Sequence, residues 1–255
     1  MALADAAKMP GAKFFPQARL NYAEAVLANP GPGPAIIFRG EDGSRRELSW
    51  TDLKRRVAAL AAALSAAGVE KGDRVAAWLP NIAEGIIGML ATASIGAIWS
   101  SCSPDFGPAG VLDRFGQIAP KVFLAVDGYL YGGKRFSNAA KIAEVMAGFE
   151  RRPRLVIVPF IGDAAALAIP GAVALDKFCA PHADAALSFT RVPFDHPLYI
   201  LFSSGTTGKP KCIVHGHGGI LLKHAAEHYF HTDLKPADRL FYFTTLGWMM
   251  WNWLA

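Results

Sequence analysis

Residues 199–211 read YILFSSGTTGKPK, an apolar run followed at once by a loop of glycines, hydroxyl side chains and lysines. The apolar run has the length and composition of a buried strand. Gly205 and Gly208 permit backbone angles that larger residues resist, so successive amide groups of the loop can converge on an anion. Lys209 and Lys211 can offset the charge of that anion. The stretch therefore predicts a phosphate-binding loop at the end of a strand.

This loop differs from the common P-loop, G-x-x-x-x-G-K-[ST], because Pro210 follows the lysine and the glycines are closer together. A nearer match, GYLYGGK, occurs at residues 128–134, but Arg135 stands where a serine or threonine would reach magnesium. The dinucleotide-binding pattern G-x-G-x-x-G does not occur in the sequence. A flexible linker is the alternative for the loop, but linkers rarely combine a preceding buried strand with clustered lysines.

Short apolar runs alternate with helical patterns from residue 34 onward, which is typical of a sheet covered by helices on both faces. We therefore predict an α/β fold with mostly parallel sheets. The expected strands are residues 35–38, 74–79, 97–100, 122–126, 155–158, 198–203 and 240–245. The expected helices are residues 50–67, 82–93, 108–115, 137–149 and 219–230, and residues 164–190 are expected to form a surface connection with a short strand or helix. Ser49 and Asp52 predict an N-cap for the first helix.

The composition favours a globular protein that binds small molecules. The 255 residues are 52% hydrophobic and carry a formal net charge of +5, with the basic residues dispersed rather than gathered in one stripe. This pattern suits anionic small molecules better than nucleic acid. Residues 85–103 contain no charge, but their glycines, threonine and serines favour a buried helix and strand over a membrane span. Three widely separated cysteines and an opening stretch without a long apolar core predict a cytoplasmic protein.

Several motifs together resemble the AMP-forming acyl-CoA synthetases, a family of adenylate-forming enzymes. The most specific is SSGTTGKPK at residues 203–211, followed by CIVH and the pair Gly218 and Gly219. FFPQARLNYAE at residues 14–24 is similar to the opening segment of the acetyl-CoA and acetoacetyl-CoA synthetase branch. WSSCSPDFG at residues 99–107 and GWMMWNW at residues 247–253 resemble the acetoacetyl-CoA synthetases more than the acetyl-CoA synthetases.

The resemblance implies an acid-thiol ligase that joins a carboxylate to the α-phosphate of ATP, releases pyrophosphate, and passes the acyl group to coenzyme A with release of AMP. Acetoacetate is the implied acid, and acetate or another short acid is the alternative. The implied ligands of the ATP phosphates are Ser203, Ser204, Gly205, Thr206, Thr207, Gly208, Lys209 and Lys211, with Thr206 or Thr207 near Mg²⁺.

Two further sites follow from the resemblance. Lys134 and Arg135 are the candidates for a phosphate of coenzyme A, and the alternative is a solvated helix start. The candidates for the wall of the acyl pocket are Trp248, Met249, Trp251 and Asn252, and the alternative is packing within an aromatic-rich buried segment.

The resemblance also divides the chain. It implies that residues 1–33 are the opening segment and that residues 34–255 are an incomplete AMP-binding domain, without the family's adenine-binding segment and C-terminal mobile domain. Because the catalytic lysine belongs to that mobile domain, we expect no ligase activity from these residues alone. The sequence does not indicate an oligomeric state.

One motif suggests a different class of protein. His224, Glu227 and His228 spell H-x-x-E-H, the inverted zinc-protease pattern, with His215 and His231 nearby. Histidines four residues apart share a helix face and could bind zinc. A zinc metalloprotease is therefore kept as a remote alternative, against ordinary histidines on a helix face.

Overall fold

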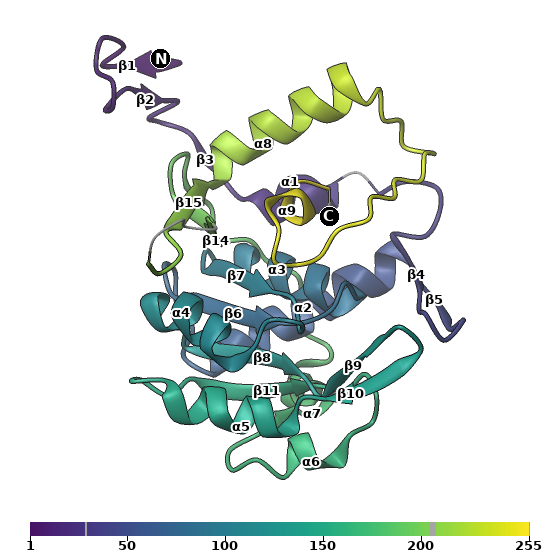
Figure 1. The fold of residues 1–255 in the computed structure, drawn as a ribbon. Coiled ribbons are helices and arrows are strands. Elements are labelled where there is room, and N and C mark those ends of the chain that lie inside the picture. The colour runs from purple at the N-terminus through teal and green to yellow at the C-terminus, as the bar shows by residue number, and fades with distance from the viewer. Residues whose placement is uncertain (29, 204–207, 255) are drawn as a thin grey trace.

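The structure is a computed structural model that describes residues 1–28, 30–203 and 208–254. A seven-stranded sheet with the order β12-β11-β8-β6-β7-β14-β15 forms its centre (Figure 1). Its neighbouring strands are parallel except for the antiparallel pair β14 and β15. In chain order the strands are β6 (Arg74–Trp78), β7 (Ile98–Cys102), β8 (Val122–Val126), β11 (Arg154–Val158), β12 (Val173–Ala174), β14 (Pro197–Phe202) and β15 (Cys212–Gly216). The predicted α/β fold with a mostly parallel sheet is confirmed.

Helices cover both faces of this sheet and create two cores. Successive side chains of a strand point to opposite faces, so Val75 and Ala77 of β6 join one core while Ala76 and Trp78 join the other. The first core contains residues of α1 (Tyr22–Ala28), α2 (Trp50–Ala66), α3 (Ala83–Ser94) and α7 (Leu175–Cys179), and the second contains residues of α4 (Pro108–Ile118) and α5 (Ala139–Gly148). Burial on both faces explains why the strands are continuous apolar runs rather than alternating ones.

The start of α2 agrees with the capping pattern. The Ser49 hydroxyl accepts a hydrogen bond from the backbone N–H of Asp52 at 3.0 Å, which satisfies one of the amide groups left free at a helix start. The uncharged stretch at residues 85–103 folds mainly as α3 and β7. Of the helices in the described part of the chain, none is long and apolar enough to cross a membrane.

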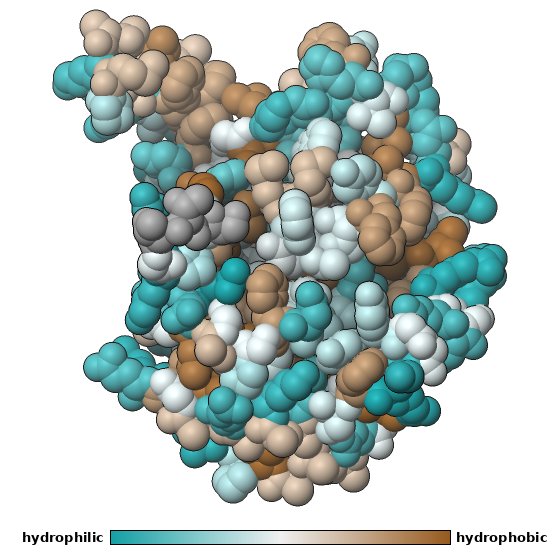
Figure 2. Space-filling model, in the orientation of Figure 1, coloured by the Kyte–Doolittle hydropathy of each residue, from teal (hydrophilic) through white to brown (hydrophobic). Residues whose placement is uncertain are grey.

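Smaller elements surround the sheet. Four two-stranded antiparallel pairs join β1 (Leu3–Ala4) to β2 (Lys13–Phe14), β3 (Arg19–Leu20) to β13 (Val192–Pro193), β4 (Ile36–Arg39) to β5 (Arg45–Leu48), and β9 (Gly128–Tyr131) to β10 (Lys134–Ser137). The first pair projects from the body of the molecule and is largely apolar on the face seen in Figure 2. The connection at residues 164–190 contains α6 (Ala164–Leu167), β12, α7 and a 3-10 turn at Ala180–His182.

The last part of the chain differs from the prediction. Helix α8 (His217–Ala226) continues into a π-helical turn, η2 (Glu227–His231), and α9 (Met249–Leu254) follows a long irregular segment. The strand predicted at residues 240–245 is wrong, because Phe241 and Phe243 lie in this segment with 83% and 88% of their surfaces exposed. A strand needs a neighbour to pair its amide and carbonyl groups, and no strand in the described ranges pairs with this segment.

Helix α3 approaches the sheet so closely that one position leaves no room for a side chain. A Cβ atom at Gly88 would lie 2.7 Å from Cη2 of Trp99 in β7 and 3.3 Å from Cδ1 of Leu124 in β8. Both of these side chains are almost fully buried. Glycine at this position therefore sets the distance between α3 and the sheet.

We predict that Gly88→Ala lowers the free energy of unfolding by about 1–3 kcal/mol, because the indole would have to shift within a packed core. Gly116→Ala is the matched control, since Gly116 is an exposed helical glycine with no other group within 4 Å of an added Cβ. The control should gain up to about 1 kcal/mol. Urea unfolding measures both, and equal stability of the two variants would contradict the close packing.

Candidate functional site

The carboxyl ends of the parallel strands meet at one edge of the central sheet. The loops that leave β6, β7, β8 and β14 begin there at Leu79, Ser103, Asp127 and Ser203. In open α/β sheets, ligands bind outside the carboxyl ends of the strands. The predicted phosphate loop therefore begins at the edge where this architecture places ligands.

The described part of the loop is Ser203 and residues 208–211. The other predicted phosphate ligands, Ser204, Gly205, Thr206 and Thr207, lie outside the described residues, and so does the assignment of Thr206 to Mg²⁺. The backbone N–H of Ser203 donates to the carbonyl of Lys211 at 3.0 Å, which closes the base of the loop. Gly208 has a φ of +86°, the left-handed conformation that favours glycine.

Lys209 and Lys211 are exposed, and the loop returns into strand β15. It is thus the connection of a β-hairpin and does not lead directly into a helix, in agreement with its departure from the P-loop pattern. The structure brings Ser203, Gly208, Lys209 and Lys211 together at the sheet edge. Their contact with phosphate stays a prediction.

The hairpin that carries the loop is attached to β7. Tyr199 of β14 pairs with Trp99 of β7, and the hydroxyl of Ser100 donates to the carbonyl of Ile200 at 2.8 Å. The ring of Phe202, the last residue of β14, packs edge-to-face on Phe115 of α4 with 6.3 Å between the ring centroids. These contacts place the start of the loop relative to the sheet and α4.

Two buried histidines join the helix after the loop to the opening segment. The backbone N–H of Tyr22 donates to Nδ1 of His217 at 3.1 Å, and the Tyr22 hydroxyl lies 3.2 Å from Nδ1 of His224. Burial, together with the smaller effect of neighbouring histidines, lowers the pKa of His217 to about 4 and that of His224 to about 4. Both rings are therefore neutral near pH 7. Burial also raises the pKa of the Tyr22 hydroxyl.

This arrangement does not support the zinc alternative. Nδ1 of His224 faces the Tyr22 hydroxyl, and Glu227 forms an ion pair with Lys223. Glu227 and His228 lie in the π-helical turn rather than in regular α-helix. Among the residues that the structure describes, no group of three or more His, Cys, Asp or Glu side chains could hold a metal ion.

Lys134 and Arg135 lie in the exposed hairpin β9–β10, so the alternative of a helix start is wrong. The turn consists of Gly132 and Gly133 with φ of +58° and +73°, and a two-residue turn of this kind favours a hairpin. The sequence GYLYGGK that resembles a P-loop is this hairpin. A guanidinium nitrogen of Arg135 donates to the carbonyl of Ile161, and no contact here tests the assignment to coenzyme A.

The four candidates for the acyl pocket divide into two pairs. Trp251 and Asn252 are 2% and 1% exposed, whereas Trp248 and Met249 are 67% and 57% exposed. Nε1 of Trp251 donates to Oδ1 of Asn81 at 2.9 Å, which places α9 beside the loop that follows β6. Oδ1 of Asn252 is buried and has no hydrogen-bond partner among the described residues. Their role in binding an acid stays a prediction.

Sequence reasoning missed Asp127, which organises two loops at the same edge. Its buried carboxylate accepts hydrogen bonds from the backbone N–H groups of Phe160, Ile161 and Asp163 at 2.8–3.0 Å. Since Ile161 in turn accepts from Arg135, this carboxylate supports the β9–β10 hairpin indirectly. A single aspartate directly after the apolar run VFLAV was the available signal, because a carboxylate can accept several amide bonds.

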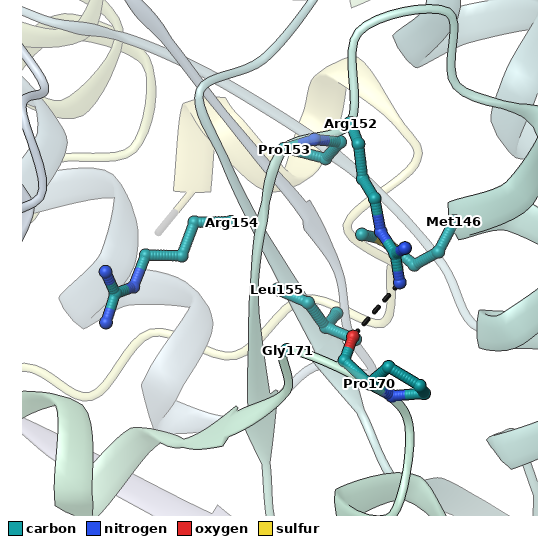
Figure 3. Close-up of a pocket in the computed structure, with 7 residues that line it drawn as sticks. All are labelled: Met146, Arg152, Pro153, Arg154, Leu155, Pro170 and Gly171. Atoms are coloured by element: carbon teal, nitrogen blue, oxygen red, sulfur yellow. Dashed lines mark hydrogen bonds between the residues drawn. The ribbon is translucent and has the colours of Figure 1, made fainter.

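Two hollows in the described surface lie away from the predicted phosphate loop. One, of about 490 Å³, is at the amino end of β11, where Arg152 donates to the carbonyl of Pro170 at 3.0 Å while Arg154 points away (Figure 3). The other, of about 330 Å³, lies between α2, α3 and α7 beside the ion pair of Arg56 and Glu84, whose N–O distance is 2.8 Å. Neither hollow contains a predicted site residue.

The central sheet, the helices on both of its faces and the glycine and lysine loop at its carboxyl edge define an α/β domain of the kind that binds ligands outside the carboxyl ends of its strands. The model of a family described as AMP-binding enzyme matches residues 23–254. The chain therefore belongs to the AMP-binding enzyme family.

Three proteins similar to this chain are named acetoacetyl-CoA synthetases. The chain is 58% identical to the acetoacetyl-coenzyme A synthetase of Rhizobium meliloti (strain 1021), over 100% of this chain and 39% of that protein. It is 44% identical to the acetoacetyl-CoA synthetase of Mus musculus, over 95% of this chain and 37% of that protein. The solved structure of acetoacetyl-CoA synthetase from Streptomyces lividans has a TM-score of 0.92 and 44% identity, and the match covers 99% of this chain and 39% of the solved one. The chain thus spans about two fifths of the length of these relatives.

The buried histidines predict a pH-dependent stability. A histidine with a folded pKa below its unfolded value of about 6.5 makes its full contribution to the free energy of unfolding above that pH. The contribution is lost as the pH falls toward about 4. We expect His217 alone to account for up to about 3 kcal/mol of this loss, because protonation of Nδ1 would also remove its bond from Tyr22.

Urea unfolding of His217→Asn between pH 4 and 7 should show a shallower dependence on pH than the unchanged protein. The exposed His231→Asn is the matched control and should keep the original dependence. The quantity to compare is the slope of the free energy of unfolding against pH, rather than its absolute value. Equal slopes in the two variants would show that His217 does not titrate as described.

Proposed function

We propose that the whole protein is an AMP-forming acetoacetate-CoA ligase. It would join acetoacetate to ATP as an acyl-adenylate with release of pyrophosphate, and then transfer the acyl group to coenzyme A with release of AMP. The observation that carries the proposal is the closed hairpin loop, in which left-handed Gly208 and exposed Lys209 and Lys211 lie at the carboxyl edge of the sheet. The choice of acid is supported by relatives that are named acetoacetyl-CoA synthetases.

The loop residues would hold the β- and γ-phosphates of ATP. Among the described residues, no other group lies within 4 Å of the place where a Cβ of Gly208 would be. Ser203 and the two lysines would supply donors, with Thr206 as the hydroxyl nearest to Mg²⁺. The metal ion would neutralise charge that develops on the leaving pyrophosphate.

Coenzyme A and the acid would occupy neighbouring parts of the same edge. Lys134 and Arg135, on an exposed hairpin, are proposed to bind a phosphate of coenzyme A. Trp248, Met249, Trp251 and Asn252 are proposed to form one wall of the acyl pocket, where an amide can hydrogen-bond a keto oxygen. The free, widely separated cysteines support a cytoplasmic location.

We predict that Gly208→Val reduces acetoacetate-dependent exchange of pyrophosphate into ATP by at least about tenfold in the whole protein. Valine is strained at a φ of +86°. The matched control is Gly219→Ala in α8, which is exposed, has no positive φ and has open space around an added Cβ. Unchanged exchange in the Gly208 variant would remove the loop from the mechanism. Faster exchange with acetate than with acetoacetate in the unchanged protein would reject the proposed acid.

We predict that Lys134→Gln combined with Arg135→Gln raises the KM for coenzyme A roughly tenfold or more and leaves the KM for ATP within about twofold. Losing two charge-assisted contacts to a phosphate costs about 1.5–3 kcal/mol each at most, less where the side chains are exposed. Lys177→Gln, an exposed lysine on α7, is the matched control. An equal rise in both KM values would contradict a role confined to coenzyme A.

A further inference from the structure

Helix α4 touches both ends of the predicted phosphate loop. At the first end, Phe115 of α4 packs against Phe202, the residue before Ser203. At the other end, Nε2 of Gln117 donates to the carbonyl of Pro210 at 2.9 Å, across 93 positions of sequence. One helix thus supports the two limbs of the hairpin from outside it.

Gln117 makes a second contact with the returning limb. The thiol of Cys212, the first residue of β15, lies 3.9 Å from Oε1 of Gln117 in a geometry suited to a weak S–H donor. The side-chain amide therefore donates on one side of Lys211 and accepts on the other. The same Nε2 also lies 2.6 Å from the carbonyl of Asp113, one turn earlier in α4, which restrains the side chain on the helix.

Helix α4, which carries Gln117, is held in place by its buried face. Val111, Phe115 and Ile118 of α4 are buried in the second core. Pro108 occupies the first turn, where its fixed φ suits a helix start. A group held on such a helix can fix a loop more closely than a group on another loop can.

We infer that Gln117 is a positioning residue for the phosphate loop, and that it holds Pro210 so that Lys209 and Lys211 face a bound polyphosphate. The inference rests on the proposed function for its ligand. Proline fixes its own φ and restricts the residue before it, so a bond to its carbonyl fixes the direction of the chain on both sides. Without this bond, the base of the hairpin is held by the pairing of Ser203 with Lys211 and of Phe202 with Cys212.

Gln117→Leu, of similar size but without the amide, tests the inference. In the whole protein, titration calorimetry with inorganic tripolyphosphate and with ATP should show a Kd about three- to tenfold higher than without the substitution, since one hydrogen bond is worth about 0.5–1.5 kcal/mol. Gln17→Leu, at the other glutamine, which is also exposed, is the matched control and should bind as before. Thermal unfolding of both variants should lie within a few degrees of the unchanged protein, since one exposed hydrogen bond contributes about 0.5–1.5 kcal/mol, so the change in Kd is not caused by loss of the fold.

Equal affinity of the Gln117 and Gln17 variants for tripolyphosphate would overturn the inference. Hydrogen exchange at the amide of Ser203 gives a second measurement that needs no ligand, and it should be faster in Gln117→Leu. If the unchanged whole protein binds neither tripolyphosphate nor ATP, the proposed function fails, and hydrogen exchange alone then tests whether Gln117 holds the loop. If the exchange rate of the Ser203 amide were also unchanged in Gln117→Leu, the inference about Gln117 would be rejected as well.

Discussion

Strand β7 is the element on which the rest of the site depends, because its successive residues Trp99, Ser100 and Ser101 together contact α3, β14 and the segment before α9. Trp99 packs against Gly88 of α3 and pairs with Tyr199 of β14. The Ser100 hydroxyl donates to Ile200 of β14, and the Ser101 hydroxyl donates to the carbonyl of Leu246 at 2.9 Å, just before α9. One buried strand thus positions a helix, the hairpin with the phosphate loop and the segment with the acyl-pocket candidates. A shift of β7 would move all three together.

Sequence reasoning located the central sheet well because its signals are local. Residues 122–126 were predicted with both bounds correct, since Lys121 and Asp127 enclose an apolar run that has to be buried on both faces. Helix α2 was predicted because Ser49 and Asp52 make its cap from adjacent residues. The connection between β14 and β15 was predicted from glycines and lysines that follow a strand directly, and its binding of phosphate stays a prediction. Each of these patterns lies within a few residues of the element it predicts.

Most of the failures involve partners that are distant in sequence. Residues 240–245 have the composition of a strand, but pairing decides whether a strand forms, and composition contains no information about the partner. The exception is the alternative that placed Lys134 and Arg135 at a helix start, because the two glycines directly before them favour the turn of a hairpin. Gln117 and His217 gave no signal at all, because their partners at Pro210 and Tyr22 lie 93 and 195 positions away. Supporting residues of a site are therefore harder to predict than its ligands.

The hairpin form of the loop explains its composition. In a P-loop the following helix directs its N-terminal amides and its dipole at the phosphates. Here the chain continues into β15 instead, so that contribution is missing and side chains have to supply the positive charge. Pro210 keeps Lys209 out of helical conformation. Lys209 and Lys211, both exposed on either side of Pro210, are the cations that this part of the loop offers in the proposed function. Gln117 of α4 contacts the carbonyl of the proline between them.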